Sequence, residues 1–326
     1  MSNSIQLKEI IGKIPSGDRF TNIFRHHQGW WRAFVLNEEV GTYYDNINKK
    51  WASVCNRINN GDHEPFKNFL TDEIAKIAMN SVEIQKEQKS GIIEKERLFN
   101  NLLSSQPLAF NFFGFLKTNP EVALAFVKTI RNEIFSVEEV VFEYAPKATK
   151  DHSAFDFGFV VLSPAGRGFI GFECKYTDAF SFKRKDSEVY YGDKSGESED
   201  KNFMAYHQLY DKCRDRFNDD YFTYVRDKNF NQLFRNEILG VQLKDEYAFV
   251  ITGLFCHHDD KETVNAGLRF QKKIGNEIND FLVVTYSDYF ECIQKLDLTW
   301  KQREFIMLLW ARYCGLQLSE MSTNPT

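Results

Sequence analysis

The six cysteines of this 326-residue chain show no pattern typical of a disulfide framework or a zinc site. No two of them form a C-x-x-C motif, and no cysteines and histidines have zinc-finger spacing. Scattered cysteines of this kind fit reduced thiols in the cytosol better than a set of disulfides. We therefore expect a cytoplasmic protein. The cysteines are Cys55, Cys174, Cys213, Cys256, Cys292 and Cys314.

Long apolar runs are also lacking. Residues 1–10 contain no apolar core, which argues against a signal peptide. An apolar run such as 122–127 is far too short to cross a bilayer. We therefore expect no membrane partner.

Neither sign of charge dominates the composition. There are 41 lysines and arginines against 46 aspartates and glutamates, a formal net charge of -5. This mild acidity argues against a histone-like nucleic-acid binder, although it leaves room for a local basic groove. With 43% apolar and 27% charged residues, the chain has an ordinary globular composition and is long enough for one large domain or two modest ones.

The first hundred residues are expected to be helical. Segment 65–79 places apolar side chains at helical spacing, and segment 83–97, rich in lysine, glutamate and glutamine, is either an exposed helix or a hinge. We place a boundary near residue 100, between an N-terminal helical region (1–100) and a second domain (101–326). The apolar positions of the first segment are Phe66, Phe69, Leu70, Ile74 and Ile77.

Beyond residue 100 the pattern alternates between helices and strands. Asn119 and Pro120 are typical of a helix start, and this helix is expected to run to about residue 135. The order of the elements predicts an α/β fold with a mixed sheet. Expected strands cover 137–144, 155–162, 168–176, 247–255 and 281–286, and further helices cover 203–217, 229–243 and 300–313.

Three charged residues interrupt two phenylalanine-rich strands. Side chains alternate between the two faces of a strand, so Glu173 and Lys175 point the same way while Phe172 and Cys174 point to the other face. Asp156 interrupts the preceding strand in the same manner. Buried charges are costly unless they serve each other or a ligand. The alternative is a partly exposed edge strand with a cross-strand salt bridge.

A hairpin between these strands would bring Asp156 and Glu173 to one end of the sheet. Two convergent carboxylates suit a hard divalent cation such as Mg²⁺, or Mn²⁺ in its place. Such a cation can polarise a phosphodiester and lower the pKa of bound water. Lys175 would orient that water or stabilise negative charge in the transition state.

Asp156 followed by Glu173-x-Lys175 resembles the motif of the PD-(D/E)XK nuclease superfamily. The resemblance covers about residues 20–285 and implies a restriction-endonuclease-like core of a helix, three strands, a helix and a further strand. It also implies metal ligation by Asp156 and Glu173 and a catalytic Lys175. Phe155 stands where the motif has proline, and Cys174 stands between the glutamate and the lysine.

More narrowly, the chain is similar to a little-characterised bacterial family of restriction-endonuclease-like proteins. The resemblance implies a Mg²⁺-dependent endonuclease that hydrolyses DNA, in restriction or phage defence, with a homodimer as the usual way to cut both strands. The alternative is a nucleic-acid-binding module on the same fold that does not cut. The stretches that carry this similarity are 25–32, 104–106 with 110–114, 168–178 and 232–236.

Three further residues are candidates for the site. Many superfamily members add a glutamate from the first helix, for which Glu133 is the natural candidate and Glu143 on the next strand the second, although either could be a solvated surface acid. Some nuclease families use a helical glutamine to bind metal-bound water or phosphate, which here would be Gln232. It shares a helix face with Arg235 and Asn236, and that face could equally be an ordinary polar one.

Two segments could contact nucleic acid. Segment 19–32 interleaves three arginines with two histidines and two tryptophans, which suits phosphate contacts and base stacking, or else a core anchor formed by the tryptophans. Segment 175–185 has a net charge of +3, whereas segment 186–200 carries six acids and one lysine, net -5. This reversal predicts a loop near the site that partly screens a basic groove.

Overall fold

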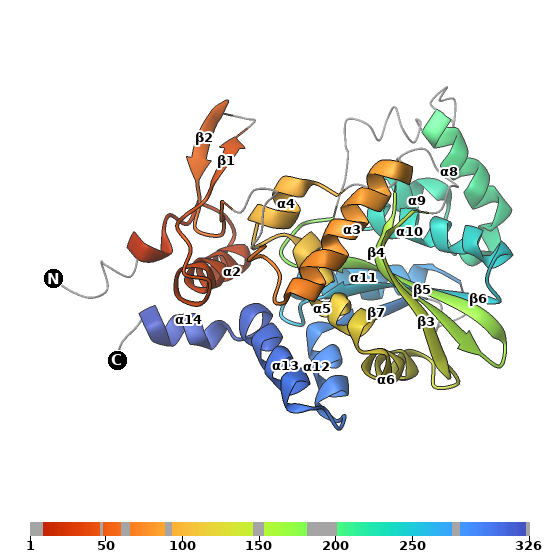
Figure 1. Cartoon of the computed structure of the whole chain (residues 1–326). Helices are drawn as coiled ribbons and strands as arrows, with labels where there is room; N and C mark the ends of the chain where they lie inside the picture. Colours follow the sequence, from red (N-terminus) through yellow and green to blue (C-terminus); the bar gives the residue numbers. More distant parts are fainter. Residues whose placement is uncertain are drawn as a thin grey trace. The chain divides into compact units, whose positions relative to one another are not determined.

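Five strands form one mixed sheet in the order β3-β4-β5-β6-β7 (Figure 1). β3, β4 and β5 follow one another as antiparallel neighbours, while β6 joins β5, and β7 joins β6, in parallel. The strands and the α/β class expected from the sequence are thereby confirmed. The strands are β3 (Ser136–Tyr144), β4 (Phe155–Ser163), β5 (Gly166–Lys175), β6 (Phe249–Cys256) and β7 (Phe281–Thr285).

This computed structural model describes residues 9–45, 48–59, 66–88, 93–145, 153–180, 201–275 and 281–323. Most of the charge reversal expected across 175–200 lies outside the described residues. The chain forms two compact units, of which the second, Glu83–Ile92 with Leu116–Lys295, contains the sheet. The first unit comprises Met1–Val82, Ile93–Phe115 and Leu296–Thr326.

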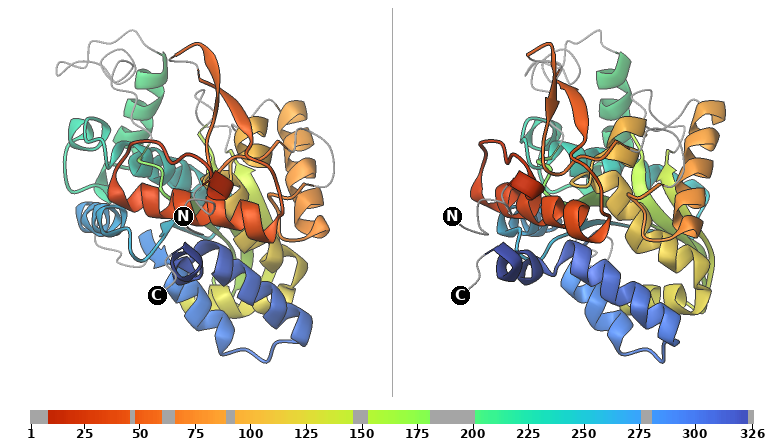
Figure 2. Two further views of the ribbon diagram at one scale, coloured as in Figure 1. Left: turned by 90° about the vertical axis from the view of Figure 1, so that its left-hand side faces the viewer. Right: turned by 60° about the vertical axis from the view of Figure 1, so that its left-hand side comes forward.

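Helices cover both faces of the sheet. α6 (Pro120–Ile130) and α12 (Tyr286–Gln294) pack side by side (Figure 2), and Phe126 of α6 contacts the ring of Phe159 on β4 at 5.9 Å between centroids. On the other face, Phe169 of β5 packs against Leu239 of α10 (Asn231–Gln242). Gly240 allows α10 a close approach to β6, because a Cβ there would lie 2.5 Å from Cγ2 of Thr252.

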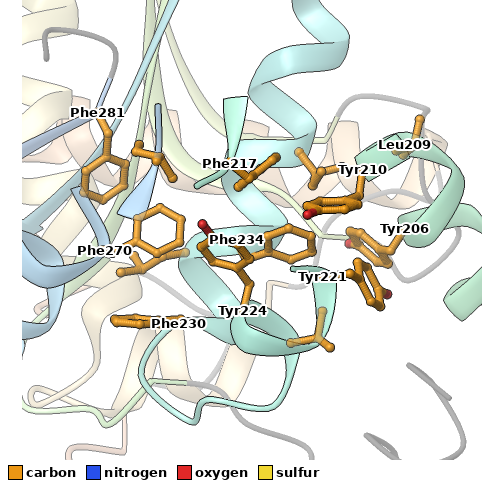
Figure 3. Close-up of a cluster of buried hydrophobic side chains, with 14 of the residues drawn as sticks. Tyr206, Leu209, Tyr210, Phe217, Tyr221, Tyr224, Phe230, Phe234, Phe270 and Phe281 are labelled. Atoms are coloured by element: carbon orange, nitrogen blue, oxygen red, sulfur yellow. The ribbon is translucent and has the colours of Figure 1, made fainter. Parts of the chain in front are cut away.

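An aromatic cluster fixes α10 among its neighbours (Figure 3). Phe234 of α10 lies at its centre, with ring centroids 5.2 Å from Phe217 and 5.5 Å from Tyr224. Such pairs add stabilisation beyond simple apolar burial. The helices that contribute are α8 (Lys201–Lys212), α9 (Tyr221–Val225), α10 and α11 (Lys261–Lys273).

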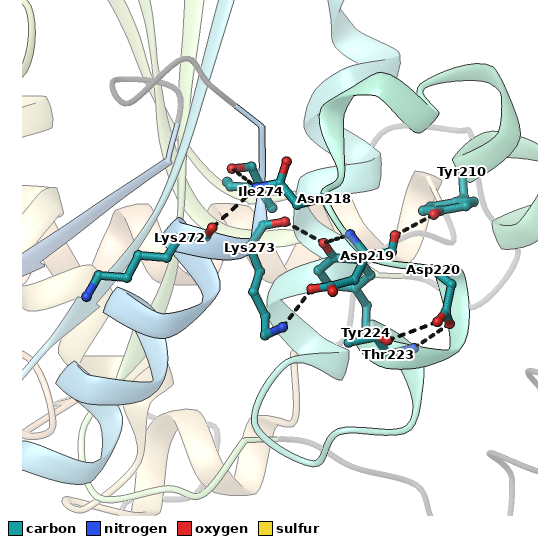
Figure 4. A network of polar contacts seen from close by, with 9 residues as sticks. All are labelled: Tyr210, Asn218, Asp219, Asp220, Thr223, Tyr224, Lys272, Lys273 and Ile274. Atoms are coloured by element: carbon teal, nitrogen blue, oxygen red, sulfur yellow. Dashed lines mark hydrogen bonds and ion pairs between the residues drawn. The ribbon is translucent and has the colours of Figure 1, made fainter.

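A polar network ties the segment before α9 to the end of α11 (Figure 4). Lys273 pairs with Asp219 at 2.6 Å, and the Asn218 amide donates to the Lys272 carbonyl at 3.3 Å. The Tyr210 hydroxyl donates to the Asp219 carbonyl at 2.7 Å. The surroundings of α10 are therefore held by polar as well as aromatic contacts.

The first unit contains a hairpin that the helical expectation for residues 1–100 missed. Its strands, β1 (Thr42–Asp45) and β2 (Lys50–Ser53), are antiparallel. The helices with residues in this unit are α2 (Arg19–Trp30, continued by a π-helical turn, Trp31–Val35), α3 (Asp72–Gln88), α4 (Lys95–Asn100), α5 (Ser105–Thr118), α13 (Trp300–Tyr313) and α14 (Leu316–Thr323).

Two helix boundaries differ from those expected. The helix expected from residue 65 begins only at Asp72, because Leu70 donates its backbone N–H to the Asn111 side chain and Thr71 caps the helix by accepting from the N–H of Ile74. The helix expected to reach residue 135 ends at Ile130. None of the described helices has the length and apolar character that a membrane span requires.

Helix α13, near the C-terminus, belongs to the first unit. Arg312 of α13 is buried and donates to the carbonyl of Asn68 at 2.8 Å, and the Asn111 amide donates to the Tyr313 hydroxyl at 2.9 Å. This unit therefore combines segments from both ends of the chain. A functional division near residue 100 stays a prediction.

Candidate active site

Glu173 and Lys175 lie at the end of β5 and are 4% and 5% exposed. Lys175 Nζ is 3.0 Å from Glu173 Oε1, as expected for residues two apart on one face of a strand. Phe172 and Cys174, on the other face, are fully buried. β5 is thus an interior strand, not an exposed edge, and its two charges lie within the protein.

Helix α10 holds the Glu173 carboxylate with two side-chain amides. Gln232 Nε2 donates to Glu173 Oε1 at 2.5 Å, and Asn236 Nδ2 donates to Glu173 Oε2 at 2.8 Å. The two amides are four residues apart and therefore share one helix face. Gln232 Oε1 also accepts from Lys175 Nζ at 2.8 Å. We call Gln232 and Asn236 the amide clamp.

Asp156 lies beside this network on the neighbouring strand. Phe157 pairs with Phe172 in the antiparallel ladder, so the next position of the same register places Asp156 opposite Glu173. Directly opposed residues of antiparallel strands share a face. Asp156 Oδ2 accepts from the backbone N–H of Cys174 at 2.6 Å. The structure therefore brings Asp156, Glu173, Lys175 and Gln232 to one end of the sheet.

The electrostatics of the site keep Lys175 charged. Burial opposes the ammonium form, but Glu173, Asp156 and Asp178 together outweigh it and raise the pKa of Lys175 above its ordinary value. Burial also raises the pKa of the Cys174 thiol far above its usual range, so this cysteine stays a neutral packing residue.

Of the two expected accessory acids, Glu133 lies elsewhere. It follows the end of α6, is exposed and pairs with Arg131 at 2.5 Å. Two residues later, the N–H of Phe135 donates to the carbonyl of Leu162, at the end of β4 away from Asp156. Six strand residues span roughly 20 Å. The structure therefore does not bring Glu133 to the other candidates.

Glu143 lies at the same end of the sheet as Asp156. The ladder pairs Phe142 with Phe157 and Tyr144 with Phe155, which places Glu143 opposite Asp156. Its φ of 47° is in the left-handed region, which costs a residue other than glycine about 1–2 kcal/mol. Strained backbone of this kind tends to cluster at functional sites. Glu143 is thus the better placed of the two accessory acids.

Several polar residues near the site had not been assigned a role from the sequence. Ser153 Oγ accepts from Arg235 Nη1 at 3.0 Å and from the Tyr206 hydroxyl at 3.1 Å, three residues before Asp156. Asn236 and Arg235 could have been found from their shared helix face with Gln232. Asp178, which influences Lys175, follows β5 with no recognisable motif.

The arginine- and tryptophan-rich segment 19–32 is partly structural. Trp31 and Arg32 are each only 2% exposed. Arg32 donates to the carbonyls of Cys55 at 3.0 Å and Ile11 at 3.1 Å. Its guanidinium therefore stabilises the fold of the first unit. The core-anchor interpretation of the two tryptophans holds for Trp31, whereas Trp30 is only partly buried.

The donor set of the site fits a hard divalent cation. Three carboxylates act on one ammonium group, so the cluster around Lys175 carries an excess of negative charge. Carboxylate oxygens are the ligands that Mg²⁺ and Mn²⁺ prefer. Asp156 and Glu173 are the residues that would hold such an ion, and a role for Glu143 beside them stays a prediction.

The sequence model of the PD-(D/E)XK nuclease superfamily matches residues 15–315. The chain belongs to this superfamily. The resemblance inferred from Asp156, Glu173 and Lys175 is thereby confirmed, and α6, β3 to β5, α10 and β6 follow the element order of a restriction-endonuclease-like core. PD-(D/E)XK nucleases generally use divalent metal ions. Neither the curated proteins nor the solved structures contain a match to this chain.

Proposed function

We propose that this PD-(D/E)XK protein is a divalent-metal-dependent endonuclease that hydrolyses phosphodiester bonds in DNA, with Mg²⁺ or Mn²⁺ held by Asp156 and Glu173. The observation that carries this proposal is the buried group at the end of β5, where carboxylates on adjacent strands meet a lysine kept charged by them. A purely structural ion pair would need neither Asp156 nor an excess of negative charge.

Each residue has a distinct role in the proposed reaction. A divalent ion at this position supplies Lewis acidity and lowers the pKa of a bound water. Asp156 and Glu173 hold the ion, and the amide clamp keeps both Glu173 oxygens in place. Lys175 is a protonated donor that stabilises negative charge developing on the phosphoryl oxygens. Gln232 fixes the position of the Lys175 ammonium.

The second candidate is a module that binds nucleic acid without cutting it. The observation in its favour is that Lys175, Glu173 and Gln232 satisfy one another within the fold, so that the network is stable by itself. A module of this kind would bind nucleic acid but cut it under no metal condition, and cleavage assays therefore separate the two functions.

Cleavage assays with matched variants test the proposal. Purified protein should degrade DNA with Mg²⁺ or Mn²⁺ but not with EDTA, and Glu173→Gln, Asp156→Asn and Lys175→Met should each lower the rate at least about 100-fold, the effect of losing one key electrostatic group. Glu133→Gln is the control, because Glu133 lies away from the site, and it should cut normally.

Two outcomes would contradict the nuclease proposal. One is DNA degradation that continues in EDTA. The other is DNA binding by the wild type with no cleavage under any metal condition, which would favour the binding module. Thermal unfolding of each variant separates loss of chemistry from loss of folding.

We further propose restriction or phage defence as the setting and a homodimer as the form that cuts both strands. A monomeric site of this kind contains one set of carboxylates and one lysine, so two copies are needed to hydrolyse two strands at once. The cytoplasmic location stays a prediction.

A further inference from the structure

The β1–β2 hairpin of the first unit carries an exposed pair of aromatic rings. Tyr44 and Trp51 are directly opposed in the ladder, and their rings contact edge to face at 5.7 Å between centroids. Trp51 is 70% exposed and Tyr44 is 45% exposed. Thr42 and Ser53, two positions further along the same face, are also exposed. We call these four residues the aromatic face of the hairpin.

The opposite face of the hairpin anchors it to the unit. Tyr43 packs against the cluster of Ile11, Val54 and Cys55, and the Arg57 guanidinium lies over its ring at 5.0 Å. The backbone N–H of Gly41 also donates to the carbonyl of Arg57 at 2.8 Å. Because these contacts hold the hairpin from the other side, Tyr44 and Trp51 are not needed to attach it.

The charges near the aromatic face favour an anionic partner. Lys49 and Lys50 are both exposed. The ladder pairs Lys50 with Asp45 on the face of Tyr43, whereas Lys49 lies directly before β2 and faces no acid in the ladder. Asp45 is the single acid among the described hairpin residues, and it accepts from the backbone N–H and the side chain of Asn48. The described hairpin therefore has an excess of positive charge on a chain whose net charge is -5.

We propose that the aromatic face binds unpaired nucleotides of the DNA substrate, with bases stacked on Trp51 and Tyr44 and phosphates near Lys49, just before β2. Aromatic side chains combined with basic residues are the usual platform for single strands, because every base has a π-face. Bases inside a duplex expose only their edges, so stacked rings on the protein favour single-stranded regions. The proposal rests on the proposed function for the identity of the nucleic acid.

Binding measured without metal tests this surface separately from catalysis. The full chain is titrated in EDTA against a labelled oligothymidylate and against a duplex of equal length, and fluorescence anisotropy is recorded. Trp51→Ala removes one ring on which a base can stack and should weaken the affinity for the single strand about tenfold. Tyr44→Ala should lower this affinity by a smaller factor. The matched control is Trp300→Ala, because Trp300 is 77% exposed on a different element, α13, and should not alter binding.

Each result of the binding titrations either supports or contradicts the proposed binding surface. A selective loss in Trp51→Ala, with unchanged thermal unfolding, supports the proposal. Equal affinities of the wild type and Trp51→Ala would overturn it, as would a loss confined to the duplex or an equal loss in Trp300→Ala. If the wild type cuts DNA but Trp51→Ala binds single strands as tightly as the wild type, the proposed binding surface is wrong while the proposed nuclease function is supported. If Trp51→Ala weakens binding but the wild type cuts no DNA, the proposed nuclease function is wrong while the proposed binding surface is supported.

Discussion

Lys175 shows how single residues carry the proposed chemistry. An isolated buried ammonium would lose its proton, but the carboxylates of Glu173, Asp156 and Asp178 raise its pKa instead. The same low-dielectric surroundings make each hydrogen bond to Glu173 electrostatically stronger than it would be in water. Charge at this site is therefore sustained by specific neighbours and not by exposure to solvent.

His27 is a second buried titratable residue with the opposite behaviour. Burial lowers its pKa to about 4, and its ring nitrogens contact Ser319 Oγ at 3.1 Å and the Ala311 carbonyl at 2.9 Å. Since the unfolded chain binds this proton near pH 6.5 and the folded chain does not, stability should be lost as the pH falls from 6.5 toward 4.

Urea unfolding at pH 7 and pH 4.5 measures this effect. The free energy of unfolding should fall by about 2–3 kcal/mol more in the wild type than in His27→Gln, which cannot titrate. The difference between the two proteins isolates His27 from the carboxylates that also titrate in this range. An identical pH dependence of both proteins would show that the buried imidazole does not govern acid stability.

Among the elements, α10 links the fold to the site. Its outer side is packed in the aromatic cluster around Phe234, and Glu237 pairs with Arg216 at 2.7 Å. Its inner side presents Gln232 and Asn236 one turn apart to Glu173. Because α10 is packed on both sides, we expect Gln232 and Asn236 to be in position before a metal ion or DNA binds.

The amide clamp should therefore affect metal affinity. Asn236→Leu removes the donor to Glu173 Oε2, and loss of such a supporting contact typically weakens metal binding about 10- to 100-fold. Calorimetric titration with Mn²⁺ measures it without any need for turnover.

Asn231 provides the matched control on the same helix. It is 2% exposed and donates to the Val225 carbonyl at 2.7 Å, away from Glu173. Asn231→Leu should lower the unfolding temperature yet leave Mn²⁺ affinity unchanged. Equal Mn²⁺ affinities of Asn236→Leu and the wild type would exclude a positioning role for Asn236.

At the scale of the whole molecule, the two units have different features. The second contains the carboxylates, the lysine and the amide clamp, whereas the first contains the hairpin with its aromatic face. The superfamily match covers residues from both units. In our two proposals, hydrolysis therefore belongs to the second unit and the contact with unpaired nucleotides belongs to the first.

Phage plating tests the proposed setting. Phage should form fewer plaques on bacteria that produce the wild type than on bacteria that produce Glu173→Gln, because the variant is expected to fold but to lack the proposed metal ligand. Sedimentation of the purified protein should show a dimer if two copies cut opposite strands. Equal plaque numbers would argue against a role in defence, and a monomer that cuts both strands would argue against the dimer.

Local pattern was sufficient to predict much of the fold. Strands β3 to β7 and helix α13 were predicted to within a few residues, because apolar periodicity and turn residues act over short distances. The end of α6 and the start of α3 were placed wrongly, because contacts such as that of Leu70 with Asn111, 41 residues away, decide where a helix stops or begins. Propensity is a weak guide wherever such tertiary contacts compete.

The charged trio of Asp156, Glu173 and Lys175 was determined by the sequence alone, because charged side chains are almost never buried in apolar strands unless they are paired or bind a ligand. The tertiary structure decided what surrounds that trio. It placed Glu143 and not Glu133 opposite Asp156, and it brought Asn236 to Glu173 across 63 residues of chain. Strand register and helix docking depend on contacts distant in sequence, and no local spacing records them. Of the scattered cysteines that led us to expect a cytosolic protein, Cys174 lies next to the site, where burial keeps its thiol neutral.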